Sequence, residues 1–147
     1  MSGYPTIIAG PRTYLPDVAT IQRAVDLSGL EVGTLVCGMA PGVDTVAWRW
    51  AKGHDLPCLA YPAPWGAQEL DYPGRVVTRR DGTRYHTGAG GWRNREMARY
   101  CQAHGGQLLA LWDGRSTGTS NMIGQARTHG LPLVIYWITT GGYDRVH

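Results

Sequence analysis

Five short apolar segments alternate along the chain with four segments whose apolar residues recur at helical spacing. The apolar segments cover residues 5–9, 33–37, 57–61, 107–112 and 131–138, and the helical ones cover residues 17–27, 43–52, 92–104 and 119–129. Each apolar segment is continuous rather than alternating, which is typical of strands covered on both faces of a parallel sheet. This order predicts an α/β, doubly wound fold with a mainly parallel, five-stranded sheet.

The loops that follow the predicted strands concentrate the residues that chemistry needs. In a parallel sheet these loops all leave at one edge, beyond the carboxyl ends of the strands, where ligands bind. They hold most of the Gly, Arg and hydroxyl residues, whereas the loops from helix to strand are short and plain. The strand-to-helix loops are residues 10–14, 38–44, 62–91 and 113–119. We therefore expect a ligand site at this edge.

The last of these loops, with the sequence DGRSTGT, is the clearest candidate for an anion cradle. Gly114 and Gly118 permit close backbone approach, and Ser116, Thr117 and Thr119 offer hydroxyl groups. The helix that follows directs its first N–H groups toward the same place. A Gly-rich turn with a Ser/Thr cap is the structural alternative. The loop lacks the lysine and the spacing of a P-loop, which disfavours an ATPase.

The first two loops add further candidate contacts. After the first strand come Gly10 and Arg12, an arginine that either reaches a phosphate or is a solvated loop residue. The dinucleotide fingerprint G-x-G-x-x-G is absent there, which disfavours an NAD(P)-dependent oxidoreductase. Gly38 and Gly42 bracket the second turn, and Asp44 falls in the first turn of the next helix. Three roles stay open for Asp44: binding ribose hydroxyls, acting as an acid or base, or complementing the helix dipole.

Two polar residues open the third helix at the same edge. Arg93 and Asn94 follow Gly90-Gly91-Trp92, and a cation in a first helical turn opposes the helix dipole. This local cost suggests a compensating anion, and hence a ligand contact. The alternative is an arginine that turns away or pairs with Glu96 or Asp113.

The composition narrows the class of protein. The 147 residues fit a single domain spanning residues 1–147, and a net charge of +3 does not by itself indicate nucleic-acid binding. The 3 Cys and 5 His lack the spacing of metal ligands, so we expect reduced thiols, no metal site and no cofactor. No apolar run approaches about 20 residues, and no secretory signal opens the chain. We therefore expect a cytoplasmic protein that does not contact membranes.

Several of these segments together resemble a known family. The sequence resembles the YspA/cpYpsA-related branch of the SLOG superfamily, which also holds the LOG phosphoribohydrolases and the DprA-like proteins. The resemblance implies a Rossmann-like domain that binds a nucleotide or nucleotide-derived ligand at the edge described above, and it adds Trp65 to the candidate contacts. The segments that carry it are IIAGPRTY (7–14), VCGMAPGVD (36–44), YPAPW (61–65), RNREM (93–97) and WDGRSTGT (112–119).

The chain departs from the LOG pattern at a catalytic position. LOG-type hydrolases carry the motif Gly-Gly-x-Gly-Thr-x-x-Glu, and here Gly118 and Thr119 match while Met122 stands in place of the glutamate. Cleavage of an N-glycosidic bond would then need another acid or base, for which Asp44 and Asp113 are the candidates. Whether the protein is an enzyme is thus left open.

A second departure is an insertion between the YPAPW and RNREM segments. Asp81-Gly82 signals a tight turn between two β-rich stretches, which predicts a β-hairpin over about residues 75–87. This hairpin carries four arginines and one aspartate, so the whole formal excess charge of the chain lies on it. It is an electropositive lid or a subunit contact, or else a solvated surface hairpin.

Three functions follow from these observations. The first is binding of a nucleotide-type small molecule, such as an ADP-ribose derivative, by a sensor, carrier or sequestering protein that forms a homodimer or a higher homo-oligomer. The second is a LOG-like nucleoside-phosphate hydrolase or transferase. The third is DprA-like binding of nucleic acid through the hairpin arginines and aromatic residues, which core packing of the tryptophans disfavours.

Overall fold

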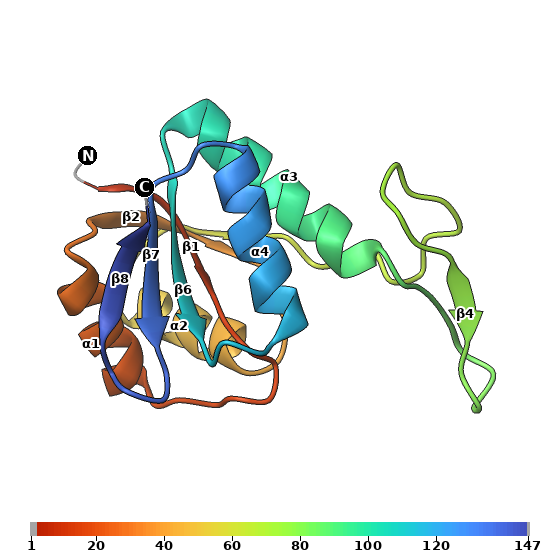
Figure 1. The fold of residues 1–147 in the computed structure, drawn as a ribbon, viewed down its shortest axis with the longest axis horizontal. Helices are drawn as coiled ribbons and strands as arrows, with labels where there is room; N and C mark the ends of the chain where they lie inside the picture. The colour runs from red at the N-terminus through yellow and green to blue at the C-terminus, as the bar shows by residue number, and fades with distance from the viewer. Residues whose placement is uncertain (1–2, 147) are drawn as a thin grey trace.

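The computed structural model describes residues 3–146, which form a twisted sheet with helices on both faces and a separate hairpin (Figure 1). The six strands of the sheet lie in the order β3-β2-β1-β6-β7-β8, and β4 and β5 form the hairpin. The strands are β1 (Tyr4–Ala9), β2 (Val32–Cys37), β3 (Cys58–Ala60), β4 (Val76–Thr78), β5 (Arg84–His86), β6 (Gln107–Trp112), β7 (Leu133–Trp137) and β8 (Tyr143–Val146). The helices are α1 (Val18–Ser28), α2 (Val43–Gly53), α3 (Ala89–His104) and α4 (Thr117–Thr128).

Neighbouring residues of each central strand contribute to two separate cores. Ile8 packs with α1 and α2 on one face, whereas Ile7 packs with α3 and α4 on the other. Leu109 and Leu108 of β6 divide between the faces in the same way. Because both faces are covered, every position of these strands favours an apolar side chain. The doubly wound α/β fold predicted from the continuous apolar segments is confirmed, with parallel pairing from β3 through β7.

The sheet has six strands rather than the five that the sequence predicts. The additional strand, β8, runs antiparallel to β7 at the edge, with Tyr136 opposite Tyr143. Its residues YDRV are mostly exposed, so they carry no continuous apolar signal. Two helices also begin earlier than predicted: α3 at Ala89 instead of Trp92, and α4 at Thr117 instead of Thr119.

The predicted hairpin is present and projects from the body of the molecule beyond the start of α3 (Figure 1). We call residues 75–87 the arm. At its tip the carboxylate of Asp81 accepts hydrogen bonds from the backbone N–H and the hydroxyl of Thr83, at 2.9 and 2.6 Å. Gly82 has a φ of 86°, as the tight turn requires. No helix among residues 3–146 is long and apolar enough to cross a membrane.

The loops after β1 and β2 press together at the carboxyl edge of the sheet. The N–H of Val43 donates to the carbonyl oxygen of Pro11. Gly42 lies between them with a φ of 82°, and a Cβ atom at this position would sit 2.7 Å from the carbonyl oxygen of Arg12. A residue without a side chain is therefore needed where the two loops meet.

Replacing Gly42 by alanine should destabilise the fold by about 2–3 kcal/mol, because the new Cβ meets backbone atoms that have no room to move. Urea unfolding at constant pH measures the change. Gly124→Ala is the matched control: Gly124 lies within α4 with nothing near its added Cβ, so it should gain roughly 0.5–1 kcal/mol. Equal behaviour of the two variants would contradict this account.

Candidate functional site

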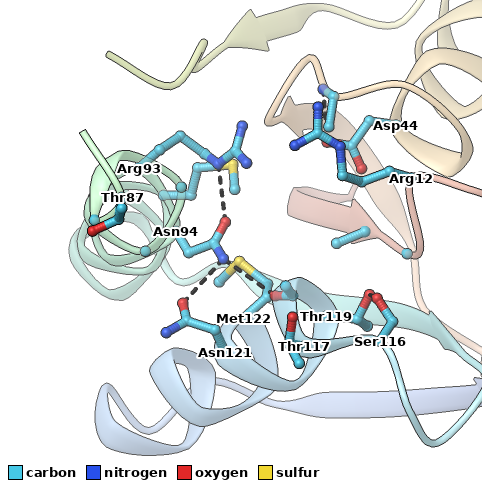
Figure 2. A pocket seen from close by; sticks show the side chains of 18 of the residues that line it. Arg12, Asp44, Thr87, Arg93, Asn94, Ser116, Thr117, Thr119, Asn121 and Met122 are labelled. Carbon is cyan, nitrogen blue, oxygen red and sulfur yellow. Dashed lines mark hydrogen bonds between the residues drawn. The ribbon is translucent and has the colours of Figure 1, made fainter. Parts of the chain in front are cut away.

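A cavity of about 720 Å³ opens at the carboxyl edge, between the loops after β1 and β6 and the first turns of α3 and α4 (Figure 2). This volume lies within the range of small-molecule sites. Most of the sequence-predicted residues line it, namely Gly10, Arg12, Asp44, Trp65, Arg93, Asn94, Asp113, Ser116, Thr117, Gly118 and Thr119.

Three predicted glycines lie outside this cavity. Gly38 lines an adjoining pocket of about 180 Å³, which shares Arg12, Trp65 and Arg93 with the cavity. Gly42 and Gly114 line neither space; they have φ values of 82° and 80° and form the turns that place the loops.

Asp44 and Arg93 both approach Gly38 in the buried part of the site. A Cβ on Gly38 would lie 2.7 Å from Arg93 Nη1 and 2.9 Å from Asp44 Oδ2, so a side chain here would displace one or both of these groups. Arg93 donates from Nη1 to the carbonyl oxygen of Gly38, and Asp44 accepts from the N–H of Ala40 at 3.2 Å. The side chains of Asp44 and Arg12 lie on the same wall of the cavity (Figure 2).

Burial has the largest effect on the pKa values of Asp44 and Arg93. Asp44 is 5% exposed, and desolvation raises its pKa to about 6, although Arg93 and the N–H of Ala40 act in the opposite direction. Desolvation likewise lowers the pKa of Arg93, while the charge of Asp44 raises it. The site therefore holds a carboxyl group that exchanges its proton near neutral pH, which is the range suited to acid–base chemistry.

Asp113, the other predicted acid or base, has a different environment. Its Oδ1 accepts hydrogen bonds from the backbone N–H groups of Ser116 and Arg115, at 2.8 and 2.9 Å. These bonds lower the pKa of Asp113, so the group stays ionised at neutral pH. Of the two carboxyls, Asp113 orders the loop, and Asp44 is the better candidate for chemistry.

The first turn of α4 presents free donors to the cavity. Within residues 3–146, no group accepts a hydrogen bond from the backbone N–H of Thr117, Gly118 or Thr119. Ser116 precedes them, and its hydroxyl lies 3.2 Å from the hydroxyl of Thr119. Such N–H groups at a helix N-terminus attract anions.

Arg93 does not lie in the first helical turn, which corrects the argument from the helix dipole. Because α3 begins at Ala89, Arg93 is the fifth residue of the helix and is buried. Instead of pairing with Glu96 or Asp113, it donates to the carbonyl oxygens of Gly38 and Tyr61 and to the side chain of Asn94. Arg93 thus ties α3 to the ends of β2 and β3.

Arg12 and Trp65 form the exposed rim shared by the two spaces. The guanidinium carbon of Arg12 lies 5.8 Å from the ring centroid of Trp65, and the Arg12 side chain is exposed. The base of the arm reaches this rim: Thr87 lines the cavity, the N–H of His86 donates to the carbonyl oxygen of Trp65 at 2.8 Å, and the ring centroids of Tyr85 and Trp65 lie 6.3 Å apart. The arginines of the arm line neither space, and its role as an electropositive lid stays a prediction.

Several lining residues were missed from the sequence. Tyr72 lies in the long irregular stretch after β3, where no periodicity marks it, and Thr87 and Gly88 precede α3. Asn121 follows Thr117 by one helical turn, and an earlier predicted start of α4 would have indicated it. Met122 lines the cavity with 1% exposure, and it is the residue that the resemblance aligns with the LOG glutamate.

Comparison with known proteins finds a similar fold. No family model and no curated protein sequence matches the chain. Among solved structures it is similar to DNA processing protein A (DprA) from Streptococcus pneumoniae, with a TM-score of 0.53 and 17% identity. The match covers 88% of this chain and 49% of the DprA chain, so the chain spans about half of that protein. The likeness supports the Rossmann-like α/β fold and nothing finer.

Asp44→Asn should stabilise the protein in a pH-dependent way. The pKa of Asp44 is near its ordinary value of 3.8 in the unfolded chain but about 6 in the folded protein. As the pH rises between these values, the unfolded chain releases the proton first, so the free energy of unfolding of the wild type decreases until Asp44 is ionised in the folded protein too. The variant should therefore be more stable than wild type by about 2–3 kcal/mol at pH 7.5 and by nothing below pH 4. Urea unfolding across this range measures the difference; a gap that stays constant with pH would contradict the assignment.

Proposed function

We propose that this protein binds a nucleotide or nucleotide-derived ligand, such as an ADP-ribose derivative, in the cavity at the carboxyl edge of the sheet. The observation that carries the proposal is the wall of this cavity, which joins the free N–H groups of α4 to the guanidinium groups of Arg12 and Arg93. A cavity of about 720 Å³ suits a ligand of this size.

The distribution of charge supports one orientation of such a ligand. An ionised Asp44 repels a phosphate but accepts hydrogen bonds from hydroxyl groups. The phosphate therefore belongs at the first turn of α4, beside Ser116 and Thr117, and a ribose belongs near Asp44. The indole of Trp65 offers an apolar face at the rim for a base.

Binding without cleavage is the favoured activity. Met122 lies at the position where the LOG motif has its glutamate, and a thioether cannot exchange a proton. A sensor, carrier or sequestering protein needs only the binding contacts. We also propose that the chain belongs to the YspA-related branch, forms a homo-oligomer and is located in the cytoplasm.

One observation favours a LOG-like hydrolase or transferase as the second candidate. Asp44 is buried beside the cavity, and its pKa of about 6 matches what a general acid or base requires. DprA-like binding of nucleic acid has less support, because the exposed arginines of the arm lie outside the cavity.

Arg12→Ala should weaken the binding of ADP-ribose about 10-fold, because it removes a charged donor at the rim of the cavity. Isothermal titration calorimetry at pH 7.5 measures the affinity. Arg23→Ala is the matched control, since Arg23 is an exposed residue of α1 that does not line the cavity. Identical losses in both variants would point to charge in general and would count against the site.

Incubation with AMP and with ADP-ribose, followed by chromatography of the products, separates the binder from the enzyme. We expect both ligands to be recovered intact, because no protonating group stands at Met122. Release of free base that disappears in Asp44→Asn would instead establish the hydrolase. Release that persists in this variant would exclude Asp44 as the reacting group.

A further inference from the structure

Four side chains along the cavity wall form a continuous chain of hydrogen bonds. Arg93 Nε donates to Asn94 Oδ1 at 3.0 Å, and Asn94 Nδ2 donates to Asn121 Oδ1 at 3.1 Å. Asn121 Nδ2 then donates to the hydroxyl oxygen of Tyr72 at 2.9 Å. All four residues line the cavity, and Figure 2 shows the first three and the bonds between them. The chain links α3 and α4 to the segment that precedes the arm.

The direction of this chain is set at its first member. A guanidinium has donors only, so the atom of Asn94 that faces Arg93 must be the amide oxygen. The amide nitrogen of Asn94 is then directed toward α4, where the carbonyl oxygen of Gly118 at 3.4 Å is a second acceptor for it. Asn121 must present its oxygen to Asn94 and its nitrogen to Tyr72. The Tyr72 oxygen thus accepts, and its single proton is left for another partner.

Tyr72 is held in place before any ligand binds. Its hydroxyl oxygen lies 2.6 Å from the point where a Cβ on Gly91 would stand, directly over the first turn of α3. The neighbouring Asp71 accepts hydrogen bonds from Trp92 Nε1 and Arg95 Nη2, both at 2.8 Å. Within residues 3–146, the hydrogen bonding of the Tyr72 hydroxyl is limited to the bond from Asn121.

We propose that Tyr72 is a specificity-determining residue that donates its phenolic proton to an acceptor on the bound ligand, and that Asn121 is the positioning residue that keeps this proton directed into the cavity. The inference rests on the proposed function and names one of its contacts. Because Asn121 already donates to the Tyr72 oxygen, the hydroxyl favours ligand groups that accept over groups that can only donate, such as ammonium. A phosphate oxygen is the strongest such acceptor.

Tyr72→Phe tests the contact with ADP-ribose as the probe, by isothermal titration calorimetry at pH 7.5. We expect about 10-fold weaker binding, because one hydrogen bond to a charged group is lost. The melting temperature should stay close to that of the wild type, since the ring still packs on Gly91. Tyr143→Phe is the matched control, because Tyr143 lies on the edge strand β8, does not line the cavity, and should bind as the wild type does.

Asn121→Asp tests the direction of the proton. An ionised carboxylate accepts only, so the Tyr72 hydroxyl should turn toward it and away from the cavity, and binding should weaken at pH 7.5. The added negative charge also weakens binding, and the same change in the Tyr72→Phe background measures that effect alone. We expect Asn121→Asp to cost several-fold more in the wild-type background than in the Tyr72→Phe background.

The outcomes separate the two proposals. If the wild-type protein binds neither ADP-ribose nor AMP, the proposed function fails, and the role of Tyr72 fails with it. If the wild type binds and Tyr72→Phe binds equally well, the cavity is the site but Tyr72 does not contact the ligand. Equal costs of Asn121→Asp in the two backgrounds would overturn the positioning role of Asn121 alone.

Discussion

The arrangement of the site depends on one buried cation. Arg93 is 9% exposed, and its guanidinium is held by the carbonyl oxygens of Gly38 and Tyr61 and by the side chain of Asn94. A charge is costly to bury unless it is paired and hydrogen-bonded, so these acceptors must stay where they are. The requirement fixes α3 against the ends of β2 and β3. It also sets the direction of the amides that lead from α3 to α4.

The same cation links the charge state of Asp44 to the occupancy of the cavity. Asp44 keeps a pKa of about 6 because burial outweighs the attraction of Arg93 and Arg12. An anion bound beside these arginines would compensate their charge in place of the carboxylate, and so favour the protonated form of Asp44. A protonated Asp44 is a hydrogen-bond donor as well as an acceptor. Under the proposed function, binding of an anionic ligand would therefore be coupled to proton uptake.

The sequence predicts the parts of this structure that follow from burial and turn chemistry. Continuous apolar strands identified the parallel sheet, and Asp81-Gly82 identified the arm. The start of α3 was misplaced because paired glycines usually interrupt helices. Here a Cβ on Gly90 would lie 3.4 Å from the ring of Trp65, and one on Gly91 would meet Tyr72, so the tertiary contacts explain both glycines. Such contacts between distant segments leave no local pattern.

At the candidate site too, the sequence predicts what depends on local pattern and misses what depends on tertiary contacts. Loop composition and the family resemblance placed most of the lining residues at one edge, yet Arg93 was singled out through an argument about helix dipoles that the structure corrects. Its real role needs Gly38 and Tyr61, residues 55 and 32 positions away in the chain. Tyr72 is brought to the cavity by Asp71, whose partners Trp92 and Arg95 lie on α3. No spacing rule connects these positions.

The likeness to DprA supports the fold, whereas the function has to be inferred from individual side chains. One Rossmann-like fold hosts many functions, and 17% identity over half of another protein does not choose among them. What distinguishes this chain is the content of one cavity: a thioether at Met122, a titratable carboxyl at Asp44 and a free phenolic proton at Tyr72. Under the proposed function these groups would hold an anion, and Asp44, whose pKa burial raises to about 6, would be protonated beside it.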